Sequence, residues 1–190
     1  MERIKIKTLL SQKANQHNLC VKGWVRTRRG SKNVSFISLN DGSTIKNIQI
    51  VADGEDFSED FLKKITTGSA ISVIGDLLES KGTEQKVEIL AKKIDILGEA
   101  DPDYYPLQPK KHSLDFLREN THLRFRTNIF ACVFRVRHAL TFAVHKFFND
   151  KGFSIIHTPI ITGADAEGAG EMFQVTTLDL EESNIDYSND

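Results

Sequence analysis

Short runs of β-branched and aromatic residues, broken by turn-forming residues, fill the first hundred positions and constrain the fold most. Two neighbouring runs are separated by Asn40-Asp41-Gly42-Ser43, whose residue types favour a tight turn. A second turn is expected at Ser80-Lys81-Gly82-Thr83, again between two such runs. The pattern predicts five strands, at 19–29, 33–40, 44–52, 69–78 and 85–97.

One helix is predicted between the third and fourth strands. Residues 57–65 place Phe57, Phe61 and Ile65 at helical spacing, and the Ser58 hydroxyl can accept a hydrogen bond from a backbone N–H of the first turn. Three strands, a helix and two strands are the order of an OB-fold, a five-stranded barrel that commonly binds single-stranded nucleic acid. The expected fold class is α+β, beginning with a five-stranded OB-fold β-barrel.

Alternation along the strands predicts two sets of side chains, because successive residues of a strand point to opposite faces. The residues expected in the core are Val21, Val25, Ile37, Leu39, Ile48, Ile50, Val87 and Ile89. Those expected outside are Lys22, Trp24, Arg26, Arg28, Val34, Phe36, Ser38, Asn47, Gln49 and Glu88. An outward aromatic ring among Arg, Gln and Glu suits base stacking with edge recognition, although each residue alone also fits ordinary surface.

Charge is distributed unevenly, although the net charge is only -1. Residues 3–40 carry nine basic side chains and no acidic one, and residues 107–151 carry nine basic against three acidic. Residues 41–106 and 152–190 are acidic. Because phosphate attraction acts over roughly 10 Å, local basic zones indicate a partner better than the net charge does. Solvated surface charge remains the alternative explanation.

A proline-punctuated segment, residues 101–109, marks a domain boundary, because proline fixes φ and lacks an N–H. A short helix is expected at 113–119, and a long one from Thr127 to about Asp150, with Gly152 as its C-terminal cap. Its apolar stripe is Ile129, Val133, Val136, Leu140, Val144 and Phe147. Additional phenylalanines widen this surface, which either an oligomer interface or the remainder of a domain would explain.

Two signatures resemble a known family. Residues 122–178 closely resemble the start of the catalytic domain of asparaginyl-tRNA synthetases, class II enzymes of the aspartyl/asparaginyl/lysyl subgroup. Residues 19–98, with the run Gly23 to Gly30 and Asn47-Ile48-Gln49, look like that subgroup's anticodon-binding domain. The resemblance implies an OB-fold anticodon-binding domain at 1–100, a hinge at 101–121 and, at 122–190, the incomplete start of a class II antiparallel α/β catalytic domain.

The resemblance assigns four residues to the anticodon. It implies that Phe36 stacks on the central uridine, that Gln49 reads the edge of this base, and that Arg29 and Glu88 contact the other anticodon bases. Strict alternation would put Arg29 on the core side. A bulge near the end of the first strand is therefore expected, because an extra residue reverses the alternation.

Two further residues are assigned by the resemblance to the catalytic domain. Pro159 ends class II motif 1 and is expected to pack across a dimer two-fold. Glu167 lies in the run 167–173, similar to a mobile loop in which this carboxylate binds the ammonium group of the substrate amino acid. A carboxylate makes a strong, charge-assisted hydrogen bond to an ammonium group, and glycines give a closing loop its freedom.

Motifs 2 and 3 of class II enzymes are not found, so no catalytic residue and no metal ligand is assigned. The implied full-length activity is asparagine–tRNA ligation with ATP and Mg²⁺, and the 190 residues alone are expected to bind the anticodon without activating asparagine. Expected partners are tRNA(Asn), asparagine, ATP and a second copy in a homodimer, in the cytoplasm and without a membrane segment. The alternatives are an aspartyl-tRNA synthetase, including one that charges both tRNAs, and a stand-alone tRNA-binding OB module.

Overall fold

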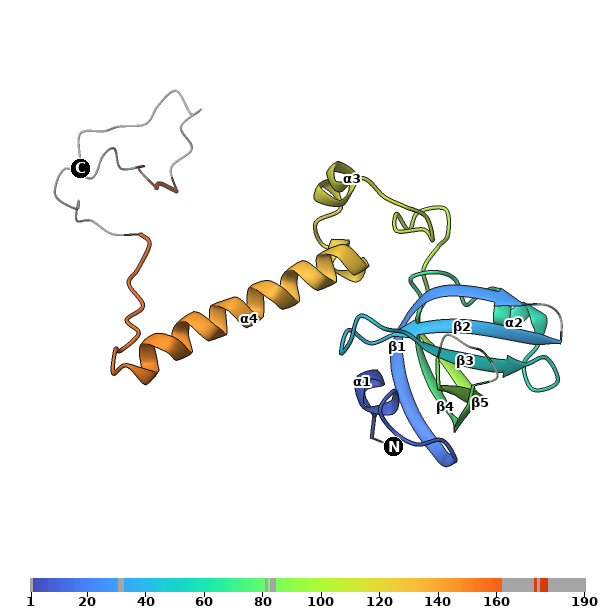
Figure 1. The fold of residues 1–190 in the computed structure, drawn as a ribbon. Coiled ribbons are helices and arrows are strands. Elements are labelled where there is room, and N and C mark those ends of the chain that lie inside the picture. Colours follow the sequence, from blue (N-terminus) through green and yellow to red (C-terminus); the bar gives the residue numbers. More distant parts are fainter. Residues whose placement is uncertain are drawn as a thin grey trace, which may run out of the picture. The chain divides into compact units, whose positions relative to one another are not determined.

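Five strands close into a barrel, and their order along the chain is the predicted one (Figure 1). In this computed structural model, residues 2–30, 33–80, 82, 85–161, 173 and 175–177 are described. The strands are β1 (Gln16–Gly30), β2 (Val34–Asn40), β3 (Ile48–Asp53), β4 (Ala70–Glu79) and β5 (Val87–Gly98). They pair in the order β1-β2-β3-β5-β4, with β3 and β5 parallel and the other neighbours antiparallel. The predicted OB-fold is confirmed.

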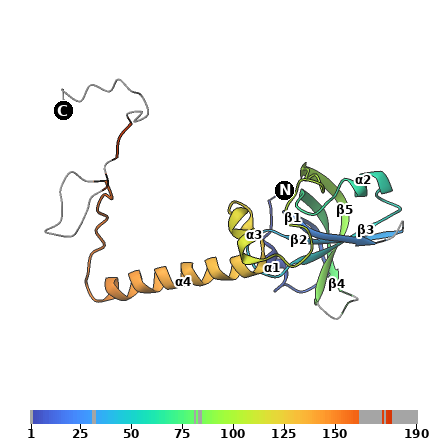
Figure 2. The same ribbon diagram turned by 90° about the horizontal axis from the view of Figure 1, so that it is seen from above.

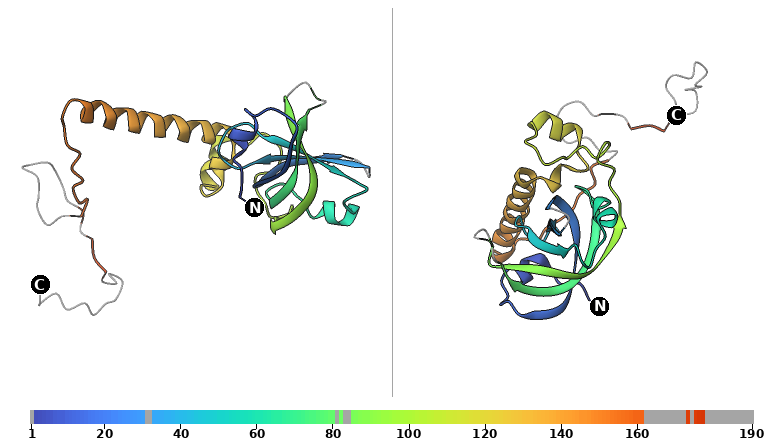
Figure 3. Two further views of the ribbon diagram at one scale, coloured as in Figure 1. Left: turned by 90° about the horizontal axis from the view of Figure 1, so that it is seen from below. Right: turned by 90° about the vertical axis from the view of Figure 1, so that its right-hand side faces the viewer.

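The barrel core is built from the residues that alternation assigned to it. Val21, Ile37, Leu39, Ile48, Ile50 and Ile89 have no exposed surface, and Val25 and Val87 are also buried. The long strands curve strongly around this core, as two further views show (Figure 3). Because burying one such aliphatic side chain contributes roughly 1.5–3 kcal/mol, this aliphatic interior is the main source of the barrel's stability.

Two short helices accompany the barrel. Helix α2 (Glu59–Lys63) lies in the predicted place, and the Ser58 hydroxyl accepts from the Phe61 amide at 3.3 Å as expected. Helix α1 (Ile6–Leu9) was not predicted, because four residues are too few for a periodic pattern. Ile6 and Leu9 have no exposed surface and belong to the barrel core. The N-terminal segment thus completes the hydrophobic interior.

Asp41, in the β2–β3 turn, holds α1 in place. Its carboxylate accepts from the Ile6 amide at 3.0 Å and from the amide and hydroxyl of Ser43 at 2.9 and 2.6 Å. Burial acts to raise the pKa of Asp41, but the hydrogen bonds from Ser43 and Ile6 outweigh it and the pKa is lowered. Asp41, which is 35 positions from Ile6 in the sequence, therefore supplies the N-terminal capping hydrogen bond of α1, because the Lys5 side chain makes none.

Replacing Asp41 by asparagine is expected to destabilise the chain by about 1 kcal/mol at pH 7, because both carboxylate oxygens accept hydrogen bonds and an amide keeps only one acceptor oxygen. The ionised carboxylate stabilises the fold above the unfolded pKa of about 3.9, and this contribution is lost as pH falls through the lower folded value. Urea denaturation at pH 7 and pH 3 should show the difference from wild type shrinking at pH 3. Asp56→Asn, at an exposed carboxylate, is the control and should show little effect at either pH. An Asp41→Asn effect independent of pH would contradict this account.

Strand β3 begins at Ile48 and not at residue 44, which corrects the predicted boundary. The Asn40 amide donates to the carbonyls of Thr44 and Lys46 at 3.1 and 2.9 Å and to Asn47 Oδ1 at 3.0 Å. These bonds commit residues 44–47 to a loop, although their β-branched composition favours a strand.

Helices follow the barrel: α3 (Leu114–Glu119), a 3₁₀ turn at Arg124–Arg126 and α4 (Asn128–Asp150), drawn as one continuous helix in Figure 2. Gly152 has φ of +84°, as expected for a C-terminal cap. No residue of α4 is buried, and its apolar stripe is exposed. Among the described residues, no helix combines the length and apolarity required to cross a bilayer.

By its contacts the chain divides into two compact units, Met1–Leu140 and Thr141–Asp190. The first contains the barrel, the linker (residues 99–113), α3 and the start of α4, and the second contains the end of α4 and the segment after it. The predicted domain boundaries at residues 100 and 121 stay a prediction.

Candidate nucleic-acid interface

A bulge in β1 decides which arginine faces outward beside Phe36. The pairing of β1 with β2 shifts between Val25 and Thr27: Val25 lies opposite Leu39, whereas Arg29 lies opposite Phe36. Directly opposed residues of antiparallel strands place their side chains on the same face. Arg29 and Phe36 therefore share the outer face, and the expected bulge is present.

The same bulge sets the pairing of Arg28. Arg28 was expected outside and is exposed, but it lies opposite the buried Ile37 and not opposite Phe36. Alternation alone does not give this pairing, because the extra residue at the bulge reverses the phase that holds up to Val25. Arg29 is also exposed and makes no ion pair with any residue that the structure describes.

Gln49 and Glu88 meet on neighbouring strands of the same face. They are partners in the β3–β5 ladder, and Gln49 Nε2 donates to Glu88 Oε2 at 2.9 Å. Ser80, which directly follows β4, donates its hydroxyl to the same oxygen at 3.0 Å. Because a carboxylate only accepts, the NH₂ group of Gln49 must face Glu88, which leaves the Gln49 carbonyl oxygen free to accept.

The four residues assigned to the anticodon thus lie on four strands of one face. Ser38 links them, because it pairs with Gln49 and is two residues from Phe36 on the outward side of β2. Phe36, Gln49 and Glu88 are half-buried, so their positions are fixed while part of each stays accessible. Sequence reasoning missed Ser80, which it counted only as a turn residue. The signal available in the sequence was a serine hydroxyl in the turn that leads into the strand carrying Glu88.

The structure does not test the two residues assigned to the catalytic domain. Pro159 is exposed in the second unit, and Glu167 lies outside the described residues. Among the residues that the structure describes, no three His, Cys, Asp or Glu side chains gather where they could hold a metal ion.

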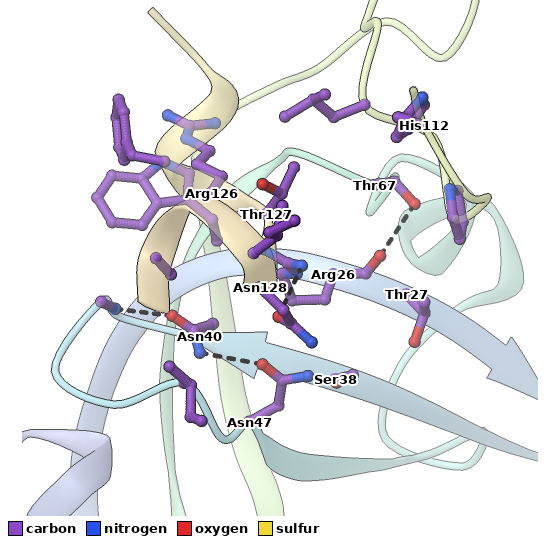
Figure 4. Close-up of a pocket in the computed structure, with 18 of the residues that line it drawn as sticks. Arg26, Thr27, Ser38, Asn40, Asn47, Thr67, His112, Arg126, Thr127 and Asn128 are labelled. Atoms are coloured by element: carbon purple, nitrogen blue, oxygen red, sulfur yellow. Dashed lines mark hydrogen bonds between the residues drawn. The ribbon is translucent and has the colours of Figure 1, made fainter. Parts of the chain in front are cut away.

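A cleft of about 980 Å³ adjoins the outer face, between β1, the β2–β3 loop, the linker and the first turns of α4 (Figure 4). The Arg126 guanidinium lies over the Trp24 ring, 4.8 Å from its centre, and donates to the Tyr105 hydroxyl at 3.4 Å. Arg26, at the bulge, donates to Asn128 at 3.5 Å. Cation–π contacts of this kind contribute about 0.5–2 kcal/mol, so this contact helps to hold the 3₁₀ turn against the barrel.

Burial lowers the pKa of Arg26; Tyr105 opposes this shift, and the positive charge of Arg126 adds to it. The guanidinium groups of Arg26 and Arg126 therefore lie close together at one wall of the cleft. The sequence indicated two basic zones, 3–40 and 107–151, but did not predict that β1 and the 3₁₀ turn bring their cations together.

Comparisons with known proteins match both halves of the chain. Residues 19–97 match the family described as OB-fold nucleic acid binding domain, and residues 113–187 match tRNA synthetases class II (D, K and N). Over its whole length the chain is 56% identical to the asparagine–tRNA ligase of Cytophaga hutchinsonii, of which it covers 43%. It is also 56% identical to that of Parabacteroides distasonis, of which it covers 42%. The chain thus spans about two fifths of the length of these relatives.

Solved structures agree in fold. Asparaginyl-tRNA synthetase from Pyrococcus horikoshii superimposes with a TM-score of 0.73 at 19% identity, over 85% of this chain and 38% of that one. Aspartyl tRNA synthetase from Entamoeba histolytica gives 0.68 at 22% identity, over 84% and 39%. At identities below 25% the structural likeness establishes only the fold. The assignment to a family rests on the sequence relatives above.

Proposed function

Because the chain belongs to the asparagine–tRNA ligase family of class II synthetases, we propose that it is the anticodon-binding and dimer-interface portion of such an enzyme. The observation that carries the proposal is the alignment of Arg29 with Phe36 and of Gln49 with Glu88 on one outer face of the barrel. The full enzyme would form asparaginyl-adenylate and diphosphate from asparagine and ATP, then transfer the asparaginyl group to the 3′ end of tRNA(Asn) and release AMP.

The chemistry of this face suits a uridine. The Phe36 ring offers a π face for stacking, which any base can use. The Gln49 carbonyl oxygen, left free by the bond to Glu88, can accept from the N3–H at the Watson–Crick edge of uracil. Arg29 supplies a planar fork of donors beside the ring, suited to a neighbouring base or phosphate.

The remaining assignments belong to the same proposal. We assign residues 1–100 to the anticodon-binding domain, 101–121 to a hinge and 122–190 to the start of the catalytic domain. Glu167 would bind the ammonium group of asparagine, and Pro159 with the exposed stripe of α4 would form a homodimer interface. Mg²⁺ would neutralise ATP phosphates, and no ligand for it is assigned to the described residues. The cytoplasmic location and the inability of these 190 residues alone to activate asparagine stay predictions.

The two alternatives receive less support. The identity of 56% is to asparagine–tRNA ligases, which favours asparagine over aspartate as the amino acid. The match of residues 113–187 to a synthetase family disfavours a stand-alone RNA-binding module, which has no use for this segment.

Binding of tRNA(Asn) transcripts to the chain tests the proposal. The transcript with the natural anticodon is expected to bind at least fivefold more tightly than one whose central uridine is changed to cytidine. The reason is that cytosine N3 lacks the hydrogen that Gln49 would accept, and an unpaired polar group costs about 1–3 kcal/mol. Changing a base in the acceptor stem is the control and should leave binding by the chain unchanged. Equal affinity for the two anticodons would refute the proposal.

A further inference from the structure

The cleft beside the outer face is lined by cations and by no described acidic residue. Five Lys and Arg side chains contribute to its wall: Arg26, Lys110, Lys111, Arg126 and Arg135. They come from four separate parts of the chain, namely β1, the linker, the 3₁₀ turn and α4. A cleft focuses the field of the charges that line it, so this wall attracts anions more strongly than the same charges on a flat surface.

None of these five cations is neutralised by a carboxylate within the described part of the chain. Arg126 lies against Trp24 and Tyr105, Arg26 bonds to Asn128, and Arg135 donates to the Gly42 carbonyl at 2.5 Å. Ion pairs elsewhere, such as Lys63 with Glu59, show that other lysines of this chain do pair. The cleft therefore keeps its positive charge.

The cleft is continuous with the proposed anticodon face. Thr27 and Ser38 line it, and these two residues are paired neighbours in the row that leads to Gln49. Aromatic side chains, among them Phe125 and Phe134, line it together with the cations. A positively charged groove with aromatic side chains is the combination that tracks an RNA strand.

We propose that this cleft binds the sugar–phosphate backbone of the RNA strand that leaves the anticodon face, with Lys110 and Lys111 contacting phosphates. The inference rests on the proposed function, because it takes the bound RNA to be the tRNA. The contacts are independent of base sequence: the anticodon face selects the tRNA, and the cleft adds affinity and orients the strand toward the linker.

Lys110→Gln/Lys111→Gln tests this, since both residues are exposed and their loss should not unfold the chain. Binding of the natural and the uridine-altered tRNA(Asn) transcripts is measured from 50 to 200 mM salt. If two phosphate contacts are lost, affinity at 0.1 M salt falls about 25- to 60-fold for both transcripts, and the slope of log K against log salt falls by about 1.4–1.8. The ratio between the two transcripts stays as in wild type.

Lys13→Gln/Lys64→Gln is the matched control, because it removes two exposed charges that make no ion pair with a described residue and do not line the cleft. It should change the slope little. An unchanged slope in the Lys110/Lys111 variant, or an equal loss in the control, overturns the cleft inference while leaving the anticodon proposal intact. If the wild-type chain binds the natural and the uridine-altered transcripts equally tightly, the anticodon proposal is overturned. The salt slopes still decide the cleft inference. Absence of any tRNA binding overturns both.

Discussion

Gly75→Ala is expected to destabilise the barrel by about 3 kcal/mol, the upper end of the cost of overpacking a core. Gly75 lies on β4 at an irregularity in its ladder with β5, where the two strands approach closely. A Cβ added to it would lie 2.2 Å from the Leu90 carbonyl oxygen and 2.8 Å from Ile89 Cγ2. Since the first neighbour is backbone, relief requires that the two strands separate. Urea denaturation followed by circular dichroism measures the loss.

Gly98→Ala is the matched control on the neighbouring strand. A Cβ there would lie 3.8 Å from the Ala70 Cβ, an ordinary contact. The stability of this variant should stay within about 0.5 kcal/mol of wild type, as for surface substitutions that meet no clash. Equal effects of the two variants would show that glycine flexibility, and not the close approach of β4 and β5, sets the result.

Phe36→Ala is expected to weaken tRNA(Asn) binding by about 1–3 kcal/mol, or roughly 5- to 150-fold, the usual cost of losing one stacked base. The ring lies beside Arg29 on the outer face and is half-buried, so its plane is held in place before RNA binds. Fluorescence anisotropy with a labelled transcript measures the change in Kd.

Two further substitutions separate stacking from packing. Phe36→Leu keeps an apolar side chain but lacks a π face, so it should bind nearly as weakly as alanine. Phe36→Trp keeps the π face and should retain most of the affinity. Thermal denaturation of each variant controls for folding, because Phe36 also contributes packed surface. Full binding by Phe36→Leu would mean that the ring does not stack on a base.

Much of the barrel was predictable because its strands and helix α2 obey simple local rules. Ile37, Leu39, Ile48 and Ile50 alternate with polar residues, and each is fully buried. Ser58 caps α2 as its residue type suggests. These features are local, so a short stretch of sequence determines them.

Features that depend on distant partners were not predictable. Helix α1 is held by Asp41, 35 residues away from the amide that it accepts from. Glu88 accepts a hydrogen bond from Ser80, which directly follows β4, and Arg126 meets Trp24 only because the linker folds back on the barrel. A sequence pattern indicates the residue types in such contacts but not which of them meet.

The bulge at Arg26 gives β1 two phases of alternation within one strand. Before it, the phase is set by the barrel interior, with Val21 and Val25 inward; after it, the phase is set by the outer face, with Arg29 beside Phe36. Removing a single residue between Val25 and Arg29 would turn the rest of the strand over while leaving the composition of the face nearly unchanged. The recognition surface is therefore encoded in the length of the strand as much as in its side chains.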